Sequence, residues 1–351
     1  MYTRELKEAP EYPVFRKEPA FGSYLGSFKF LDISGMRRPY GGFPIPSAVT
    51  KLRIFGSASF FFCDGDILGE TFFFSNPVFA YMETVVWNRK TAVRHVYRQP
   101  VLNRLTRMPR KIEGGSISCR KKRNFARLSI RENLHNFALA LKLTGTRGAK
   151  NRRQDLSGKL VLSCAAAGGA VFSALVPYVN RRRCQASIYA AGYAGGEISC
   201  SGKTQRFQGA ALAELREAYF SLRTKAARLY GFSVWNGKVL AFCLGDSVSK
   251  DDYACNSNVL LYDGKITPLP PVRITRPYGS AGEWIIQDTE NMVDLKFLPV
   301  SVYAHKKSLL IVRTQYKTVY GNFEGALMTA DGEMLPLKDF PGIAKKILLR
   351  L

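Results

Sequence analysis

The sequence has few of the residues on which metal, redox and nucleophilic chemistry depend. Only three of the 351 residues are histidines, and they lie far apart, at His95, His135 and His305. The seven cysteines include no Cys-x-x-Cys pair and no zinc spacing with a histidine, so we expect free thiols and no metal site. The chain also has no Gly-rich phosphate loop and no nucleophile elbow around a serine. These absences predict a protein that works without a cofactor.

The chain lacks a signal-peptide pattern and has one long uncharged run. The opening residues, MYTRELKE, are charged and contain no apolar core, which predicts a cytoplasmic location. Residues 160–179 carry no charge and precede a run of three arginines, as a membrane-spanning helix with a positive flank would. Paired glycines at 168 and 169 and Pro177 disfavour such a helix, so we expect no transmembrane span. A hairpin of residues 159–164 and 170–179 fits the run better.

Acidic residues are scarce, since 27 Asp and Glu stand against 52 Lys and Arg, a net charge of +25. Most of the excess lies within residues 89–183, which contain 23 basic and 3 acidic residues. Such a field attracts nucleic acid, anionic lipid or an acidic partner. Two basic runs with aromatic neighbours are the candidate anion-binding residues, namely Arg120, Lys121, Lys122, Arg123, Arg181, Arg182 and Arg183. Runs of this kind at hairpin tips are commonly only solvated.

Hairpin turns are what the sequence has in abundance. Asn236-Gly237, Asp263-Gly264 and Asp331-Gly332 each stand between two apolar and β-branched runs, and Asp64-Gly65 repeats the signal. Asn-Gly and Asp-Gly tolerate the positive φ angles that a two-residue type I′ loop requires. The sequence therefore predicts an all-β protein.

Composition along the chain predicts two halves and two short helices. A polar, basic segment at residues 145–158 is typical of a linker, and 351 residues exceed one ordinary core. We expect an N-terminal β half with a basic surface over residues 1–150 and a C-terminal β-barrel half over residues 155–351. Helical spacing of Ala and Leu predicts helices at residues 208–229 and 341–351.

The C-terminal half resembles the DUF2804 family. The resemblance rests on the order and spacing of several segments, which are FSVWNGKVLAFCLG (232–245), NVLLYDGK (258–265), Trp284, VDLKFLP (293–299) and YGNFEG (320–325). Proteins of this family are of unknown function and are similar to the carotenoid hydratase and tocopherol cyclase group of lipocalin-like proteins. The resemblance implies two lipocalin-like antiparallel β-barrel or sandwich halves packed on each other, with an apolar ligand cavity.

Two segments depart from the family pattern. Family members carry a tryptophan-rich segment ahead of the hairpin at Asn236-Gly237, whereas residues 213–226 contain no tryptophan here. They also carry a Glu-Asn pair before the Tyr-Asp-Gly-Lys turn, where this chain has Ser257-Asn258. If these residues line the family's cavity, this chain has lost an acid and aromatic walls. A diverged member without catalytic activity is therefore one of the two hypotheses.

Candidate site residues follow from the chemistry that the resemblance implies. Hydration or cyclisation of an isoprenoid double bond without a cofactor needs a carboxylic acid kept protonated in an apolar pocket. The candidates are Asp246, for which turn chemistry is the plainer explanation, and Asp294, for which a solvent-facing strand position is. Residues that would line a hydrophobic ligand site, or simply pack in the core, are Trp235, Tyr253, Asn258, Tyr262, Trp284 and Gln315.

Two functions from different classes remain open on the sequence alone. The first is a lipocalin-like protein that binds a hydrophobic small molecule, isoprenoid or lipid-like, with or without acid-type chemistry on it. The alternative is a basic, non-catalytic binding module for nucleic acid or an anionic membrane surface. The sequence leaves open whether the protein is an enzyme.

Overall fold

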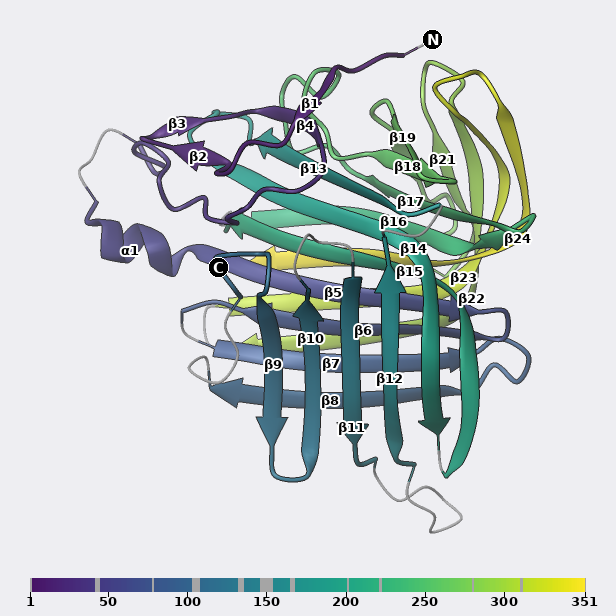
Figure 1. The fold of residues 1–351 in the computed structure, drawn as a ribbon. Coiled ribbons are helices and arrows are strands. Elements are labelled where there is room, and N and C mark those ends of the chain that lie inside the picture. The colour runs from purple at the N-terminus through teal and green to yellow at the C-terminus, as the bar shows by residue number, and fades with distance from the viewer. Residues whose placement is uncertain are drawn as a thin grey trace.

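A computed structural model of the chain describes residues 2–41, 45–77, 79–102, 108–131, 136–145, 154–164, 168–200, 202–220, 223–279, 281–309 and 312–350. Within these residues the protein is almost entirely β, which confirms the predicted fold class (Figure 1). The one helix of this part of the chain is short, α1 (Ser47–Leu52). Two large antiparallel sheets hold nearly all strands, and β2 (Val14–Phe15) pairs separately with β3 (Glu18–Pro19).

The first sheet has 13 strands and curls into a nearly closed barrel. Its main path runs β8-β7-β6-β5-β15-β14-β12-β11-β10-β9, and β13, β4 and β1 branch from β14. The strands are β1 (Leu6–Glu8), β4 (Gly22–Leu25), β5 (Ile54–Asp64), β6 (Ile67–Ser75), β7 (Phe79–Asn88), β8 (Arg94–Leu102), β9 (Ser116–Lys121), β10 (Asn124–Ile130), β11 (Asn136–Leu143), β12 (Leu156–Ser163), β13 (Ala170–Pro177), β14 (Cys184–Cys200) and β15 (Lys203–Tyr219).

The two ends of this path meet at β8 and β9. Cys119 Sγ donates to Gln99 Oε1 at 3.4 Å, and Lys121 Nζ donates to the Pro100 carbonyl at 3.3 Å. Every second side chain of a strand points to the same face of the sheet, so alternate apolar side chains fill the interior of the barrel. Leu139, for example, lies in the interior core.

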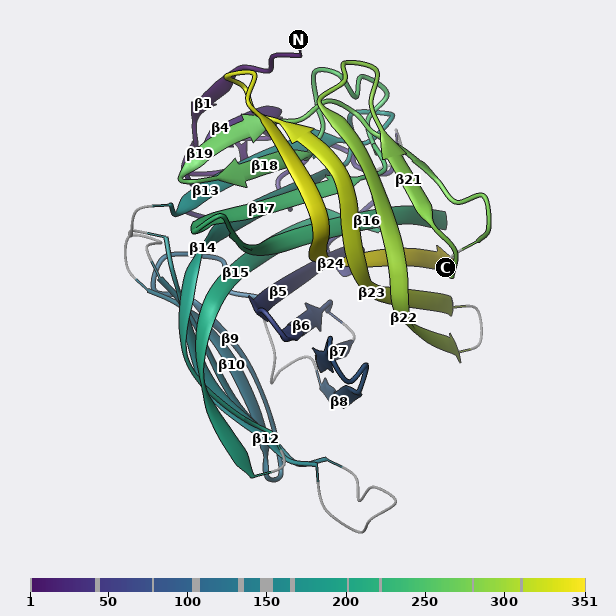
Figure 2. The ribbon, with the colours of Figure 1, turned by 90° about the vertical axis from the view of Figure 1, so that its right-hand side faces the viewer.

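The second sheet has nine strands in the order β19-β18-β17-β16-β24-β23-β22-β21-β20 and forms a half-barrel. Figure 2 shows its green and yellow strands arching over the first sheet. They are β16 (Arg223–Trp235), β17 (Lys238–Gly245), β18 (Val259–Tyr262), β19 (Lys265–Pro268), β20 (Arg273–Thr275), β21 (Trp284–Gln287), β22 (Val293–Leu309), β23 (Val312–Met328) and β24 (Met334–Arg350).

Three apolar cores hold these sheets in place. One fills the barrel and a second fills the concave side of the half-barrel. The third lies between the sheets, where Phe61, Trp87 and Tyr189 of the first sheet meet Tyr230 and Tyr320 of the second. Phe61 and Tyr230 stack with their ring centroids 4.5 Å apart. The two sheets therefore share a buried interface.

Two of the four predicted pairs form type I′ turns, whereas at Asp64-Gly65 and Asp331-Gly332 only the glycine has a positive φ. Asn236 and Gly237 join β16 to β17 with φ angles of 49° and 76°, and Asp263 and Gly264 join β18 to β19 with 49° and 79°. Both central positions have positive φ, as a type I′ turn requires.

The helices predicted at residues 208–229 and 341–351 are wrong, because nearly all described residues of these ranges belong to β15, β16 and β24. The cause is burial on both faces of the strands. Leu215 of β15 points into the barrel, while Leu212 on the opposite face lies in the core between the sheets. Apolar residues on both faces hide the two-residue alternation that identifies a half-buried strand.

The run at residues 160–179 forms strands, but not the predicted hairpin. β12 and β13 both pair antiparallel with β14, β12 with Tyr193–Cys200 and β13 with Cys184–Ala191. They therefore follow one another along the same edge of one long strand. In the described part of the chain, no helix is long and apolar enough to cross a membrane.

The chain passes from the first sheet to the second between Tyr219 and Arg223. The boundary expected between residues 150 and 155 falls between β11 and β12, which are neighbouring strands of the first sheet.

Candidate functional site between the two sheets

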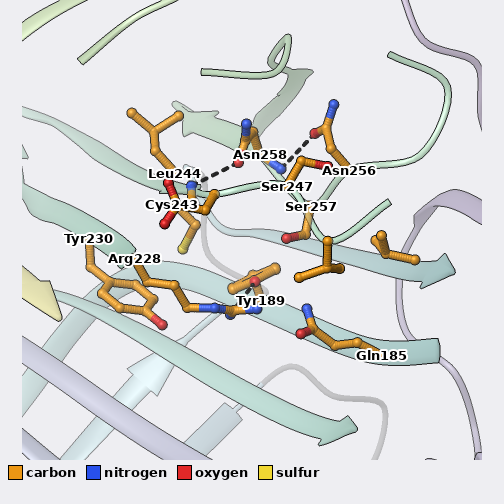
Figure 3. A pocket seen from close by; sticks show the side chains of 14 residues that line it. Gln185, Tyr189, Arg228, Tyr230, Cys243, Leu244, Ser247, Asn256, Ser257 and Asn258 are labelled. Carbon is orange, nitrogen blue, oxygen red and sulfur yellow. Dashed lines mark hydrogen bonds between the residues drawn. The ribbon is translucent and has the colours of Figure 1, made fainter. Parts of the chain in front are cut away.

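A small polar pocket lies where the two sheets meet (Figure 3). Its floor is made by Gln185 and Tyr189 of β14 and Arg228 and Tyr230 of β16, and its roof by the loop from Asp246 to Asn258. The cavity measures about 20 Å³. This is the room that about one water molecule, or one oxygen atom of a ligand, requires.

Register places the polar floor residues opposite one another. Glu214 and Arg216 are two residues apart on β15, so both point towards the second sheet, and Tyr189 of β14 pairs with Glu214. Arg228 and Tyr230 are two residues apart on β16 and face the first sheet in return. Five polar side chains from three strands thereby converge inside an otherwise apolar interface.

A buried ion pair organises the floor. Arg228 Nη1 donates to Glu214 Oε1 at 2.6 Å and to the Tyr189 hydroxyl oxygen at 3.2 Å. The Tyr230 hydroxyl donates to the other carboxylate oxygen, Oε2, at 3.0 Å. The side chains of Arg228 and Glu214 are only 12% and 6% exposed, so the pair is shielded from solvent. Charge-assisted hydrogen bonds of this kind hold the groups in one geometry.

Burial sets the protonation of the floor. It raises the pKa of Tyr189 to about 12, and burial together with the Glu214 charge raises the pKa of Tyr230 well above its ordinary value. Burial alone would lower the pKa of Arg228, but attraction by Tyr189, Glu214 and Tyr230 raises it instead. At neutral pH the floor therefore holds two neutral phenols and one fixed guanidinium cation.

A second arginine adjoins the pocket beside Gln185. Arg216 Nη2 donates to Gln185 Oε1 at 2.6 Å, and the guanidinium lies 5.3 Å from the centre of the Phe55 ring. Its Nε is buried and has no hydrogen-bond partner among the described residues. Burial and the neighbouring Arg228 lower the pKa of Arg216. Gln185, held by this arginine, presents its amide to the pocket in a fixed orientation.

The roof loop is fastened by side-chain amides and by the N-terminal segment. Asn258 Oδ1 accepts from the Gly245 N–H at 2.9 Å, and Asn258 Nδ2 donates to the Pro270 carbonyl at 2.9 Å. The Tyr2 hydroxyl donates to the Tyr253 carbonyl at 2.5 Å, and Arg4 Nη2 donates to the Asn258 carbonyl at 3.0 Å. The first residues of the chain thus tie down the loop that covers the pocket.

A second buried ion pair crosses the same interface. Lys345 of β24 pairs with Glu70 of β6, and its ammonium lies 5.1 Å from the centre of the Phe61 ring and 4.7 Å from that of Phe72. The nearby Tyr320 hydroxyl is buried without a hydrogen-bond partner in the described part of the chain. Within residues that the structure describes, no group of His, Cys, Asp or Glu has the arrangement of a metal site.

The structure brings two of the sequence candidates, Asp246 and Asn258, to the pocket. Asp246 Oδ2 accepts from the Ala227 N–H at 2.7 Å and so extends the pairing of β16 with β17. Asp294, the other acid candidate, lies on the exposed face of β22, where Oδ1 accepts from Gln287 at 2.9 Å.

Three of the remaining ligand candidates, Trp235, Tyr262 and Trp284, belong to the core of the half-barrel and do not line the pocket. Trp284 is fully buried against Phe297, and Trp235 packs edge-on against Tyr262. The side chain of Tyr253 is 47% exposed. Gln315 lies in β23, and its side chain is outside the described residues.

The two basic runs lie at different ends of the molecule (Figure 1). Arg120 and Lys121 end β9, Lys122 and Arg123 form the turn to β10, and Arg181, Arg182 and Arg183 precede β14. In the second run Arg183 packs on the Tyr40 and Tyr178 rings, at 5.2 and 5.9 Å from their centres.

The pocket floor was not predicted from the sequence. Tyr189 and Tyr230 are ordinary strand residues in the sequence, and Glu214, Arg216 and Arg228 fell in the wrongly predicted helix. The sequence feature that could have identified these residues is a charged residue within a strand that is apolar on both faces. Such a charge is buried and therefore requires a partner.

Comparisons with known proteins give one family and a set of distant structures. CghA aligns over 95% of this chain and 99% of its own, with 13% identity and a TM-score of 0.44. Kievitone hydratase from Nectria haematococca aligns over 94% and 97%, with 9% identity and a TM-score of 0.40. A comparison with curated proteins finds no match. The family model of DUF2804, a domain of unknown function, matches residues 60–350, and the chain therefore belongs to this family.

Proposed function

We propose that the protein binds a small molecule at the pocket between its sheets, with an oxygen atom of the ligand held by Tyr189. The observation that carries this proposal is the hydrogen bond from Arg228 to the Tyr189 oxygen. Because the oxygen accepts from the guanidinium, the phenol proton is directed to the pocket, where Ser257 is its neighbour and a ligand oxygen would take the place of that hydroxyl. The Gln185 amide, fixed by Arg216, supplies a second polar contact at the same place.

The ligand has a hydrophobic body and a carbonyl or hydroxyl head. Apolar groups beside the polar floor support this assignment, since Val176, Leu244 and Val248 line the same pocket. A cavity of about 20 Å³ admits the head alone. The roof loop therefore has to shift to seat an isoprenoid or lipid-like body.

Acid-type chemistry in this pocket would use a phenol in place of a carboxylic acid. The carboxylate of Asp246 accepts a backbone N–H, and that of Glu214 accepts from Arg228 and Tyr230. Tyr189 remains protonated and donates to the ligand oxygen, while Arg228 stabilises the negative charge that grows on the phenol oxygen as its proton moves. Glu214 orients Arg228 and does not contact the ligand.

The experiment compares the wild-type protein with Tyr189→Phe and Tyr193→Phe. Both tyrosines lie on β14, but the Tyr193 hydroxyl donates to the Gly237 carbonyl outside the pocket, so it is a matched control. Small molecules that co-purify are extracted and identified by mass spectrometry, and the compound found is then titrated into each variant. Tyr189→Phe removes one hydrogen bond between neutral groups, so we expect it to bind the compound about three- to tenfold more weakly than the wild type. Tyr193→Phe should bind it with unchanged affinity.

Equal affinity in Tyr189→Phe and Tyr193→Phe would place the ligand elsewhere and reject the proposal. An anionic partner, the alternative function, would meet a different surface and does not depend on this pocket.

A further inference from the structure

The outer surface of strands β9 to β12 presents a regular array of cations. Arg120, Phe125 and Lys142 pair across β9, β10 and β11, so they form one row on the same face. Arg127 and Lys159 lie one step further along that face on β10 and β12. The alternate residues of these strands point into the barrel core, as Cys119 and Ala126 do. The array is therefore held by the register of the sheet.

None of these cations forms an ion pair within the described residues, although Glu197 of β14 lies directly across from Lys159. Among the described residues, none of the ion pairs of the chain includes Arg120, Lys122, Arg123, Lys142 or Lys159. Elsewhere on the surface the pattern is different, since Lys265 pairs with Asp331 and Lys90 with Asp66. The positive charge of Arg120 and Lys142 on either side of Phe125 is thus not neutralised by an ion pair in the described part of the chain.

The tip of the same surface is hollowed around an aromatic ring. A depression of about 730 Å³ surrounds Phe125 and is lined by the cations Arg120, Lys122, Arg123 and Lys142. The one acid in its lining, Asp155, accepts from the Gly145 N–H at 3.2 Å. The depression is open to solvent and is larger than the inter-sheet pocket.

We propose that this face binds single-stranded nucleic acid, with a base stacked on Phe125 and the flanking phosphates on the cations of the row. Neighbouring strands are about 4.8 Å apart, which places a cation on each side of the ring. A ring between cations is the arrangement that proteins use for single strands without sequence preference. The face is the convex outside of a barrel (Figure 1), so it cannot enclose a duplex.

Charge and shape favour nucleic acid over a membrane as the occupant. Apart from the half-buried Phe125, Val161 is the one large apolar side chain that this face exposes within the described residues of β9 to β12. Proteins that bind anionic membranes through a stable anchor combine basic residues with an apolar segment that enters the bilayer. Such a segment is not found on the described part of this face.

The test measures binding of a fluorescent 12-nucleotide oligothymidylate by anisotropy at 50 and 200 mM salt. Four phosphate contacts on a single strand predict a salt slope of about −2.8, which is a loss of roughly 50-fold in affinity between these conditions. Lys142→Glu should weaken binding at both salt concentrations and lower the slope by about 0.7, whereas Arg182→Glu, the same change in the other basic run, should leave both unchanged. Phe125→Leu, which keeps an apolar side chain, should weaken binding about five- to 100-fold through lost stacking.

Three results would overturn the proposal. They are no binding at 50 mM salt, equal effects of Lys142→Glu and Arg182→Glu, and tighter binding to a 12-base-pair duplex than to the single strand. If the protein binds vesicles that contain phosphatidylserine but does not bind the oligonucleotide, the partner of this face is a membrane surface and the proposal is wrong. Circular dichroism and thermal melting of each variant establish that it is folded, and the pocket variant Tyr189→Phe should bind the oligonucleotide as the wild type does.

Discussion

The buried ion pair between Glu214 and Arg228 gives the sharpest prediction about the site. Glu214→Gln keeps the shape and one oxygen of the side chain but removes the negative charge. The Arg228 guanidinium, only 12% exposed, then keeps hydrogen-bond partners but has no counter-charge. Leaving a buried charge unpaired costs about 3 to 5 kcal/mol, so we expect the free energy of unfolding to fall by about that amount.

Urea denaturation followed by tryptophan fluorescence measures this change. The matched control is Asp331→Asn, which makes the same carboxylate-to-amide change in the exposed pair with Lys265, whose side chains are 72% and 66% exposed. Exposed pairs contribute about 0 to 1 kcal/mol, so the control should hardly differ from the wild type.

A double variant separates charge from packing. Glu214→Gln with Arg228→Met removes both charges and leaves an apolar side chain of similar length, so it should regain most of the lost stability. The reasoning is refuted if Glu214→Gln loses no more free energy of unfolding than Asp331→Asn, or if the double variant is as unstable as Glu214→Gln alone.

Three further predictions concern pH, the roof loop and a close contact. Burial, opposed by a hydrogen bond from the Ile33 N–H, raises the pKa of Glu217 to about 8 from 4.5, so between these pH values the folded state binds the extra proton and stability falls as pH rises. Glu217→Gln should remove a slope of at most about 1.4 kcal/mol per pH unit in urea denaturation, and an unchanged slope would contradict this. The Tyr2 hydroxyl donates to the Tyr253 carbonyl, so Tyr2→Ala should speed amide hydrogen exchange within residues 247–257 but not in β10. If exchange in both segments changes equally or not at all, the N-terminal segment does not hold the loop. Gly231→Ala would place a Cβ 2.2 Å from the Phe242 ring and should cost about 1 to 3 kcal/mol, whereas Gly195→Ala, whose nearest neighbour is 3.9 Å away, should cost less than about 1 kcal/mol; similar urea midpoints for both would refute the steric argument.

Local signals predicted the fold class, and long-range packing escaped prediction. Asn236-Gly237 and Asp263-Gly264 specify their turns through the φ angles of two residues, so the sequence suffices. Residues 208–229 were misread because the faces of β15 both contact apolar cores, and this depends on segments far away in the chain. The hairpin at residues 159–179 failed for a similar reason, since the long strand β14 serves both partners.

The candidate site follows the same division. Asp246 and Asn258 were identified because they adjoin turns and motifs of the family, and both line the pocket. Tyr189 and Arg228 come together from strands of different sheets, and only the packing of one sheet on the other reveals them. No local pattern marks such a pair.

Native mass spectrometry of the intact protein, purified without added ligand, tests the central claim of a small-molecule site most directly. The proposal predicts a bound mass on the wild-type protein and on Tyr193→Phe that is reduced or lost in Tyr189→Phe. A bound mass retained in full by Tyr189→Phe, or its absence from the wild-type protein both as purified and after incubation with a lipid and isoprenoid extract, would contradict it.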